Sequence, residues 1–579
     1  MYTECMSSKI IFKDEKTVAN ANVPDLERTR KNFSYDDNVQ DLVWFDHKKI
    51  NAAYNAVTKN AFSARRNKVA LYYESEDGTK EKFTFQEVEE RSNQIAHYLK
   101  DLGVEKGDRV FIFLPRIPEL YFSFIAALKL GAVAGTMFSA FGPQALYDRL
   151  DQSDAQVLIT TKDLSHRLDS VRRKLPHLKN ILITDGEFGE KYKSKSKEFN
   201  CAKTNEDDDA FMLYTSGTTG KPKGVVHGHG AIVHEYLTAK WVLDLKEDDV
   251  YWCTADPGWV TGIAYEILGT WANGASTVVT AARFDPADWY RIIEEYKVNV
   301  WYSAPTAVRM LAAQPDDLHK KYDLSSLRHL ASVGEPLNPE IIFWSLRAYG
   351  LPFHDNYFQT ETGGIMIANF PSLPIKPGSM GRPFPGIKIH IVDPEGNQLP
   401  ANSIGRLTFE PNWPSLMKKL WRRPQKFESY FMKMKPNKKR LYVTGDLAYL
   451  DDDGYVWFVG RDDDVIKTSG ERVGPFEVES ALVAHHDVIE AGVIGKPDEL
   501  RGQIIKAFVV LKKGVLGNDQ KKEEISQYVK RNLAGHAYPR EIEFVEKLPK
   551  TRSGKIMRRI LKAQEMGLPI GDTSTLEEY

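Results

Sequence analysis

The chain has 579 residues, which is too long for one hydrophobic core, since single cores stop growing at about 250–300 residues. Hydrophobic residues (42%) and charged residues (27%) occur at the averages of folded globular chains, which excludes wholesale disorder. Because 78 Lys and Arg balance 79 Asp and Glu, the formal charge of -1 provides no overall field that would draw the protein to nucleic acid or to an anionic membrane.

Three cysteines, Cys5, Cys201 and Cys253, are too few and too widely spaced for a disulfide framework or a cysteine-based zinc site. The N-terminal residues contain no apolar run of signal-peptide length, so we expect a cytoplasmic protein. The most apolar stretch, residues 120–138, is interrupted by Lys129 and two glycines. It predicts a buried helix and strand rather than a membrane span.

The chain begins with polar, weakly periodic residues 1–45, which we expect to lie as an arm over the surface. From residue 46 on, β-rich runs alternate with helix-length stretches, as in VALYYE, FTFQEVEERSNQIAHYLKDLG, RVFIFLP, AQVLITT and KNILITD. Helices between strands predict crossover connections and mainly parallel sheets, and so an α/β fold. A lysine-rich and then acidic run across residues 191–210 predicts a solvated loop.

Later segments are richer in strands, as in GIKIHIVDPEGNQLP and DLAYLDDDGYVWFVG, where Glu395-Gly396 and Asp453-Gly454 are hairpin turn signals. A new unit follows Gly460, with its own strands and helices. We therefore predict a large domain of stacked, mainly parallel sheets with helices and a β-subdomain (46–462), followed by a small mobile α+β domain (463–579).

The strongest chemical signal is the segment YTSGTTGKPKG at residues 214–224, between the strands AFMLY and VVH. Its glycines let the backbone approach an anion, its hydroxyls donate, and Lys221 and Lys223 supply charge. Pro222 stands where a Walker A loop has its magnesium-binding Ser or Thr. The alternative is an idle flexible loop. The predicted phosphate loop comprises Thr215, Ser216, Gly217, Thr218, Thr219, Gly220 and Lys221.

This segment is similar to the signature of the acyl-adenylate-forming enzymes, which include acyl-CoA synthetases, the adenylation domains of peptide synthetases and beetle luciferases. The resemblance extends from about residue 45 to 570 and its further motifs come in the family's order. They are GEP (334–336), YFQTETG (357–363), YVTGD (442–446), GR (460–461), SGER (469–472) and PKTRSGK (549–555). The resemblance implies a two-step reaction: an acid and ATP yield acyl-AMP and pyrophosphate, and a thiol then displaces AMP.

The resemblance also implies roles for individual residues. Thr360 would contact phosphate, and Glu361 would hold Mg²⁺, a cation that prefers oxygen ligands beside substrate phosphates. The implied AMP-binding residues are Gly334, Glu335 and Pro336 along the adenine, Tyr357 beside its ring, Asp446 and Arg461 at the ribose, and Asp355 and Arg472. Taken singly, Asp446 or Arg461 would more often be a cap or half of a surface ion pair.

Lys555 is implied to enter the site during adenylate formation, where its ammonium would meet the developing negative charge. In acetyl-CoA synthetases the matching lysine is an acetylation target, so a lysine acetyltransferase or deacetylase is a candidate partner. The hinge between the two steps would lie at Asp463, and rotation would bring Ser469 and Gly470 to the coenzyme A side of the site. Without the resemblance, Lys555 is typical of an exposed lysine and Asp463 of a cap or turn.

The stretches DPGWVTG, WYSAPTAVRML and SVGEPLNP resemble acetyl-CoA synthetases, in which Val260, Thr261 and Val333 would wall the acyl pocket. That subgroup carries two tryptophans before QTETG, whereas this chain has Tyr357 and Phe358. Acetate is the expected substrate, and propionate, butyrate or a branched short acid is the alternative, because a hydrophobic pocket discriminates one methylene only weakly. In another interpretation, neighbours repack around Phe358 and the specificity does not change.

No carrier-protein domain follows the last motif, so free coenzyme A is the expected thiol. Lys530 and Arg531 are candidates for its phosphates, with exposed helix charge as the alternative. ATP and coenzyme A would be co-substrates and Mg²⁺ the cofactor. Rival hypotheses are an adenylating enzyme that loads a separate carrier protein and a nucleotide sensor without chemistry.

Overall fold

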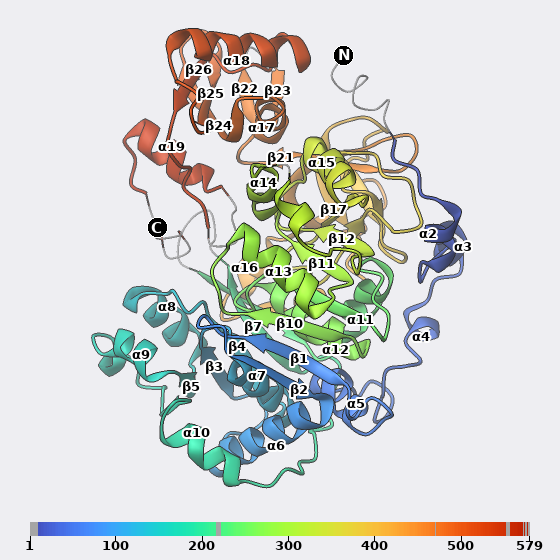
Figure 1. Ribbon diagram of the computed structural model, residues 1–579, viewed down its shortest axis with the longest axis vertical. Coiled ribbons are helices and arrows are strands. Elements are labelled where there is room, and N and C mark those ends of the chain that lie inside the picture. The colour runs from blue at the N-terminus through green and yellow to red at the C-terminus, as the bar shows by residue number, and fades with distance from the viewer. Residues whose placement is uncertain are drawn as a thin grey trace.

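The computed structural model describes residues 10–215, 222–315, 317–468, 471–551 and 556–570, together with Thr573 and Leu576. Two large sheets form its body, a five-stranded sheet flanks them, and a separate C-terminal unit lies at one end of the long axis (Figure 1). No helix in the described ranges is both long and apolar enough to cross a membrane.

The first large sheet contains the strands on either side of the phosphate-loop segment. Its inner strands β7, β4, β3, β5 and β6 are parallel, as predicted, and β8 and β18 run antiparallel at one edge. In spatial order its strands are β18 (Lys419–Leu420), β8 (Lys223–Gly228), β7 (Asp209–Thr215), β4 (Val133–Thr136), β3 (Arg109–Phe113), β5 (Val157–Thr160) and β6 (Asn180–Ile183).

The second large sheet has nine strands. Its central part from β1 to β13 is parallel, and β2, β14 and β15 add antiparallel edges. In spatial order the strands are β15 (Arg382–Pro383), β14 (Ile367–Ala368), β13 (Phe353–Tyr357), β12 (His329–Ser332), β11 (Val300–Ser303), β9 (Val250–Cys253), β10 (Ser276–Thr280), β1 (Val69–Glu74) and β2 (Lys80–Thr84).

Helices cover both faces of both sheets, and the strand sequences show why. In β3, Val110 and Ile112 face the central core, whereas Phe111 and Phe113 face a second core on the other side. A strand buried on both faces is apolar throughout, which is the pattern of RVFIF. The central layer contains α6 (Phe85–Asp101), α7 (Pro118–Leu130), α11 (Ala231–Trp241), η5 (Gly262–Leu268) and α12 (Gly269–Ala272), and the outer layers contain α8 (Pro143–Ser153), α13 (Pro286–Tyr296), α14 (Pro305–Ala312) and α15 (Pro339–Tyr349).

The apolar stretch at residues 120–138 forms most of α7 followed by β4, as predicted. The solvated loop predicted at residues 191–210 is only partly correct, because Tyr192 packs into the central core with 1% of its surface exposed. Shorter elements complete the large domain: η1 (Tyr54–Thr58), α5 (Lys59–Ala61), α9 (Lys162–Ser165), η2 (His166–Leu168), η3 (Arg172–Lys174), α10 (Glu187–Lys191), η4 (Tyr192–Ser194) and η6 (Leu318–Lys321).

The predicted β-subdomain is a five-stranded antiparallel sheet. The turn at Asp453-Gly454 joins β20 and β21 in a hairpin, as expected. Gly396 has a φ of +87° and also sits in a turn, after which Gln398 bridges back to Val392 of β16 in antiparallel sense, as the signal predicts. The full strand that pairs with β16 is β17, which begins at Gly405. The elements are β16 (Ile389–Val392), β17 (Gly405–Phe409), α16 (Pro424–Glu428), β19 (Phe431–Lys433), β20 (Arg440–Leu450) and β21 (Val456–Arg461).

The C-terminal unit has its own core, in which Ile525 and Val529 of α18 are buried. The link from β21 to β22 contains Asp463, the predicted hinge. The elements of the C-terminal unit are β22 (Ile466–Thr468), β23 (Glu471–Val473), α17 (Pro475–Val483), β24 (Val488–Asp498), β25 (Gly502–Leu511), α18 (Asp519–Asn532), β26 (Glu541–Phe544) and α19 (Arg558–Met566).

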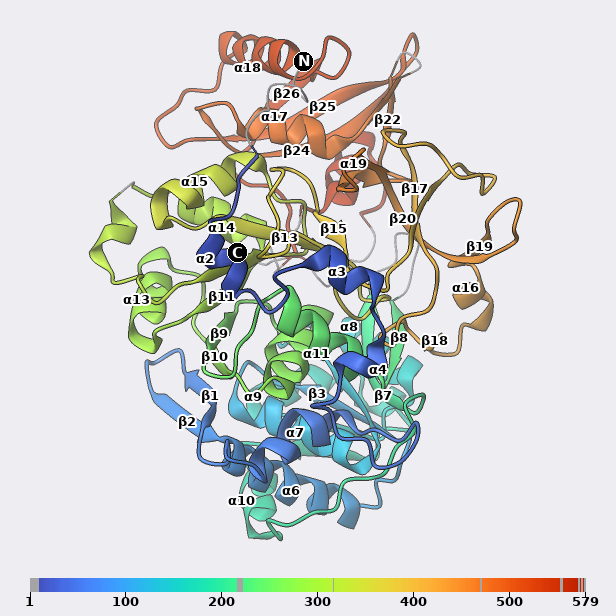
Figure 2. The same ribbon diagram turned by 90° about the vertical axis from the view of Figure 1, so that its right-hand side faces the viewer.

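The N-terminal segment runs over the outside of the body (Figure 2). It carries α2 (Glu15–Asn20), α3 (Leu26–Lys31) and α4 (Tyr35–Asn38). It is also packed into the body, because Leu26 is 1% exposed and Ile11 pairs with Ile375.

Candidate active site

The predicted nucleotide-binding residues come together near strand ends of the nine-stranded sheet and the β-subdomain. Residues 334–336 follow β12, and Tyr357 ends β13. Asp446 lies in β20, paired directly with Arg461 of β21. In open α/β sheets the crevice beyond the carboxyl ends of parallel strands is the usual ligand site.

Asp446 receives contacts from three separate elements. Tyr357 Oη donates to Asp446 Oδ2 at 2.5 Å, and Gln359 Nε2 donates to the same oxygen at 2.9 Å. Arg461 Nε lies 3.5 Å from Asp446 Oδ1. Tyr442 Oη donates to Gln359 Oε1 at 2.8 Å and so orients the amide. A carboxylate accepts up to about four hydrogen bonds, so this fixed group is prepared for the two hydroxyls of a ribose.

Burial governs the ionisation of these neighbours. Burial, followed by the charge of Asp446, raises the pKa of Tyr357 well above its usual range, so the phenol stays protonated and donates. Burial opposes the charge of Arg461, but the carboxylates of Asp446 and Asp463 outweigh it and raise the pKa of Arg461. The site therefore holds a neutral donor and a permanent cation around one carboxylate.

The backbone of the TETG motif is clamped through three consecutive carbonyl groups, at residues 360–362. His227 Nε2 lies 2.8 Å from the first, and the Met417 N–H donates to the second at 2.9 Å. The indole N–H of Trp413 and the hydroxyl of Ser415 donate to the third at 2.9 and 2.7 Å. His227 belongs to β8, the strand that leaves the phosphate loop, so the clamp couples the two motifs.

The clamp fixes the position of the Glu361 carboxylate, which Tyr430 Oη contacts at 3.1 Å. Glu361 is half-buried, as is Thr360 before it. A carboxylate and a hydroxyl are hard oxygen donors, the kind that Mg²⁺ takes alongside substrate phosphates. The residues present therefore fit the magnesium role.

Replacing His227 by Leu is expected to separate stability from nucleotide binding. Burial lowers the pKa of His227 to about 4, so the ring is neutral near pH 7 and donates through one nitrogen. Its loss leaves a buried carbonyl unpaired, which costs about 1–3 kcal/mol of unfolding free energy in a urea titration. The two ring nitrogens face the carbonyls of Ser415 and Thr360, and the neutral ring donates to one of them. Because leucine would no longer hold the TETG backbone at this point, we expect the KM for ATP to rise.

His329→Leu is the matched control. His329 is also buried, and its Nε2 lies 3.1 Å from the Val242 carbonyl, away from the TETG motif. This variant should lose comparable stability with an unchanged KM for ATP. An equal KM in both variants would show that His227 does not position the motif.

Glu335 of the predicted adenine motif belongs to a network that crosses to the C-terminal unit. Thr306 Oγ1 donates to Glu335 Oε1 at 2.7 Å, and Arg309 Nη2 lies 3.1 Å from Glu335 Oε2. Arg309 also donates to Asn338, and Asn338 Nδ2 donates to Ser480 Oγ of α17 at 2.9 Å. Gly334 itself adopts a φ of +98°, a conformation that favours glycine, and is exposed.

Asp355, a predicted AMP-binding residue, is 3% exposed within β13. Its Oδ2 accepts a long hydrogen bond of 3.4 Å from the Leu337 N–H, and burial raises the pKa of Asp355 well above its usual range. In this position the Asp355 carboxyl group contacts the backbone of Leu337, the residue that directly follows the adenine motif.

Three of the predicted acyl-pocket residues belong to the central core or pack against it. Val260 and Val333 are 6% and 7% exposed, and Phe358 packs against the same core. The Phe358 ring meets Tyr265 edge to face, with ring centroids 5.4 Å apart. Tyr265 Oη is fixed by the Ile365 N–H at 2.7 Å, so Phe358 has a rigid support. Thr261 is half-buried.

Several predicted residues are not described structurally. Thr215 ends β7, but Ser216, Gly217, Thr218, Thr219, Gly220 and Lys221 lie outside the described residues, as do Ser469, Gly470 and Lys555. Arg472 pairs with Lys467 in the backbone of β22 and β23. Lys530 and Arg531 are exposed on α18, with Lys530 Nζ 5.0 Å from the Tyr538 ring centroid.

A cluster of possible metal ligands lies apart from this site, at His485, His486, Asp487 and Glu524. Lys521 Nζ lies 2.8 Å from the Asp487 carboxylate and 2.7 Å from that of Glu524. The Lys521 ammonium therefore already forms ion pairs with both carboxylates.

Sequence reasoning missed the residues that hold the motifs in place, namely His227, Gln359, Trp413, Ser415 and Tyr430. Gln359 lies within the recognised YFQTETG motif and so carried a local signal, although no role was predicted for it. The others come from distant segments, and their partners depend on tertiary contacts.

Comparisons with known proteins agree with this geometry. Residues 58–421 match the family model described as AMP-binding enzyme, and residues 477–555 match the one described as AMP-binding enzyme C-terminal domain. Among curated relatives, the chain is 52% identical over 567 residues to the acetyl-coenzyme A synthetase of Bacillus subtilis (strain 168), covering 96% of this chain and 98% of the relative. It is 42% identical to that of Methanothrix thermoacetophila, covering 92% and 86% of the two chains.

Solved structures show the same likeness. The anthranilate CoA ligase AuaEII, in complex with anthranoyl-AMP, matches with a TM-score of 0.83 and 30% identity, covering 93% of this chain and 99% of the other. The acyl-CoA synthetase of Brucella canis matches with a TM-score of 0.71 and 33% identity over the same shares.

Proposed function

The chain belongs to the family of AMP-binding enzymes, and from this premise we propose that it activates acetate with ATP and transfers the acetyl group to coenzyme A. The observation that carries the proposal is the Asp446 carboxylate held by Tyr357, Gln359 and Arg461, beside the clamped Glu361. It supports a nucleotide site with separate positions for the ribose and for metal-bound phosphates.

In the first step, an oxygen of the acid attacks the α-phosphorus, and the bond from that phosphorus to the bridging oxygen breaks. Pyrophosphate leaves with the electron pair, and a mixed anhydride, acetyl-AMP, remains. Asp446 would hold the ribose so that the α-phosphate lies in line with the acid, and such positioning supplies much of the rate. Glu361, with Thr360 beside it, would hold Mg²⁺, which neutralises phosphate charge when bound.

In the second step, the thiolate sulfur of coenzyme A attacks the acyl carbon and AMP leaves. We propose that residues 463–579 rotate about Asp463 between the two steps, which lets one pocket carry out both reactions. The Asn338–Ser480 hydrogen bond, which joins the large domain to α17, would break in that motion. Ser469, Gly470, Lys530 and Arg531 remain proposed coenzyme A contacts, and Arg472 remains a proposed AMP contact.

The test of the proposed function is AMP formation by the purified protein with ATP, magnesium, acetate and coenzyme A. We expect AMP and acetyl-CoA to form in equal amounts, and only when every substrate is present. If adenylation occurs without any turnover on coenzyme A, a separate carrier protein becomes the acceptor. If there is no acid-dependent pyrophosphate exchange, adenylation itself is excluded.

The size of Phe358 is proposed to set the acid. Phe358→Gly should shift kcat/KM from acetate toward butyrate or 2-methylbutyrate, and Phe358→Trp should sharpen the preference for acetate. Each methylene in an apolar pocket is worth about 1–3 kcal/mol, or roughly 10–200-fold in kcat/KM. Phe284→Gly is a matched control, because Phe284 packs on Trp289 in the core on the far side of the sheet. This control variant should change the stability of the protein but not the ranking of the acids by kcat/KM. If both Phe358 variants also kept that ranking, Phe358 would not be the residue that sets specificity.

Two finer proposals follow from the same site. Acetylation of Lys555 by a lysine acetyltransferase, reversed by a deacetylase, would abolish its charge and halt adenylation. A cytoplasmic location is proposed from the sparse cysteines, of which Cys201 and Cys253 are unpaired thiols.

A further inference from the structure

Three basic residues lie close enough together for their charges to interact, and one of them, Lys223, also interacts with the charge of Glu361. They are Lys223, which belongs to the YTSGTTGKPKG segment, and Arg423 and Lys426, which lie outside the recognised motifs. The short strand β18 runs antiparallel to β8, with Leu420 opposite Val225. The Trp421 N–H then donates to the Gly224 carbonyl at 2.8 Å. This pairing places residues 421–423 beside the start of β8, where the phosphate loop returns to the sheet.

Tyr430 gathers two of these cations around Glu361. Its Oη contacts Glu361 Oε1 at 3.1 Å. Lys223 Nζ and Lys426 Nζ each lie 5.9 Å from the centroid of the Tyr430 ring. Lys223 interacts with the charge of Glu361, the carboxylate proposed to hold magnesium, and Lys426 interacts with Lys223.

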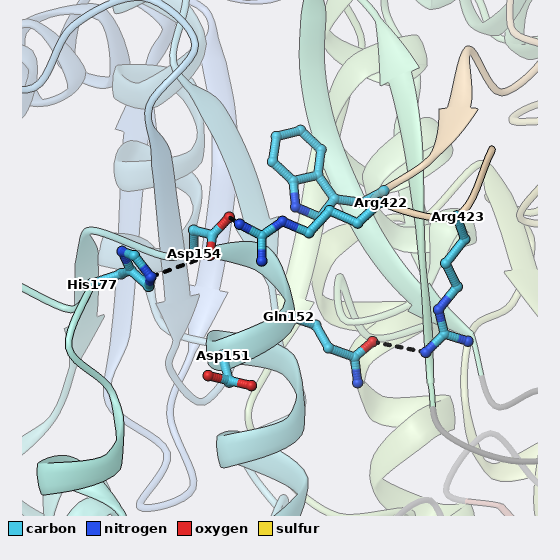
Figure 3. A pocket seen from close by; sticks show the side chains of 7 residues that line it. Asp151, Gln152, Asp154, His177, Arg422 and Arg423 are labelled. Atoms are coloured by element: carbon cyan, nitrogen blue, oxygen red, sulfur yellow. Dashed lines mark hydrogen bonds and ion pairs between the residues drawn. The ribbon is translucent and has the colours of Figure 1, made fainter.

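The third cation, Arg423, points away from its neighbour Arg422 (Figure 3). Arg422 lies 2.5 Å from Asp154, and this carboxylate is also 3.6 Å from His177. Arg423 Nη2 instead contacts the neutral amide oxygen of Gln152 at 3.2 Å. Arg422 is thus compensated, whereas the contact of Arg423 leaves its charge in place.

Within the described part of the chain, no carboxylate lies within ion-pair distance of Lys223, Arg423 or Lys426. Burial lowers the pKa of Lys223, and repulsion from Lys426 and Arg423 adds to that lowering, while Glu361 opposes it. Holding like charges together is unfavourable unless an anion joins them. An anion with several charges fits three cations better than a single carboxylate does.

We propose that Arg423 and Lys426, together with Lys223, bind the pyrophosphate portion of ATP and hold it as it leaves. The proposal rests on the proposed function and adds basic residues from two further positions, 423 and 426, to the proposed phosphate site. Cations placed where negative charge develops on a leaving pyrophosphate stabilise that transition state. The second reaction step involves no pyrophosphate, so these residues should affect only the first.

The experiment compares Arg423→Gln, Lys426→Gln and Arg422→Gln with the unaltered protein. Pyrophosphate exchange into ATP gives the KM for pyrophosphate, and calorimetry with magnesium pyrophosphate alone gives its Kd. We expect each of the first two variants to raise both constants about 10–100-fold, the range of one charge-assisted hydrogen bond. Arg422→Gln should stay within about twofold, and Arg423→Lys should recover most of the loss.

Thioester formation from supplied acetyl-AMP and coenzyme A reports on folding, and it should remain unchanged in all of these variants. The proposal would be overturned if the KM and Kd for pyrophosphate in Arg423→Gln and Lys426→Gln equalled those in Arg422→Gln. An equal loss of the thioester step would do the same, because it would indicate general damage. If the unaltered protein bound pyrophosphate but catalysed no exchange, the anion site would stand and the proposed function would fall.

Discussion

Replacing Asp446 by Ala is expected to reduce kcat/KM for adenylation by about 10²–10⁴-fold, because two hydrogen bonds to a charged group are worth about 1.5–3 kcal/mol each. The substitution removes the ribose acceptor and also the group that Tyr357 and Gln359 contact. Arg461 would lose its carboxylate partner at 3.5 Å, which leaves more positive charge beside the nucleotide. The measurement is acetate-dependent pyrophosphate exchange over a range of ATP concentrations.

Deoxynucleotides distinguish ribose binding from general damage. If Asp446 holds the ribose hydroxyls, the unaltered protein should discriminate strongly against 2′-deoxy-ATP and 3′-deoxy-ATP, and Asp446→Ala should discriminate little. Asp451→Ala is the matched control. Asp451 directly follows β20 in the same hairpin, and its Oδ2 lies 2.7 Å from Lys376 Nζ. It should lose stability and keep the discrimination. Equal discrimination by Asp446→Ala and the unaltered protein would refute the ribose role.

Lys555→Ala is expected to lower adenylation by about 10²–10³-fold, the effect of removing one positioned donor from developing negative charge. Thioester formation from supplied acetyl-AMP should stay within about threefold of the unaltered rate, because the lysine acts in the first step alone. Separate assays of pyrophosphate exchange and of thioester formation from supplied acetyl-AMP measure the effect on each half-reaction.

Lys550→Ala is the control for Lys555, five positions earlier in the same motif. Lys550 is buried, and its Nζ lies 2.5 Å from Glu490 Oε1. Its loss leaves a buried carboxylate uncompensated, so we expect a lower unfolding free energy and similar losses in both half-reactions. If Lys555→Ala also reduced both halves equally, its assignment to the first step would be wrong.

The layered architecture was predictable because each strand carries its own burial pattern. In β3 alternate residues face two different cores, and its continuous apolar run indicates burial on both sides. The α18 helix likewise buries Ile525 and Val529 and exposes Lys530, as its spacing predicts. The turn signal at Gly396 correctly predicted a reversal, since Gln398 bridges back to Val392, but it does not reveal that the next full strand begins at Gly405.

The recognised motifs identified the reaction because each is a short contiguous segment whose side chains serve one chemical group. They predict roles for Tyr357, Glu361, Asp446 and Arg461, and hydrogen bonds and ion pairs connect three of these residues directly. Gln359, two positions before Glu361 in the YFQTETG motif, also contacts Asp446. The roles could be proposed without knowing how the segments are arranged, since the order of motifs along the chain implies the family.

The sequence by itself determined the layered α/β class, the small C-terminal unit and the residues that would meet ATP. The tertiary structure decided which groups hold those residues: His227 reaches the Thr360 carbonyl from 133 positions away, and the pairing of β18 with β8 brings Arg423 near Lys223. The physical reason is that periodicity reports which face of an element is buried, whereas contacts between distant segments depend on strand order and register, which no local pattern encodes.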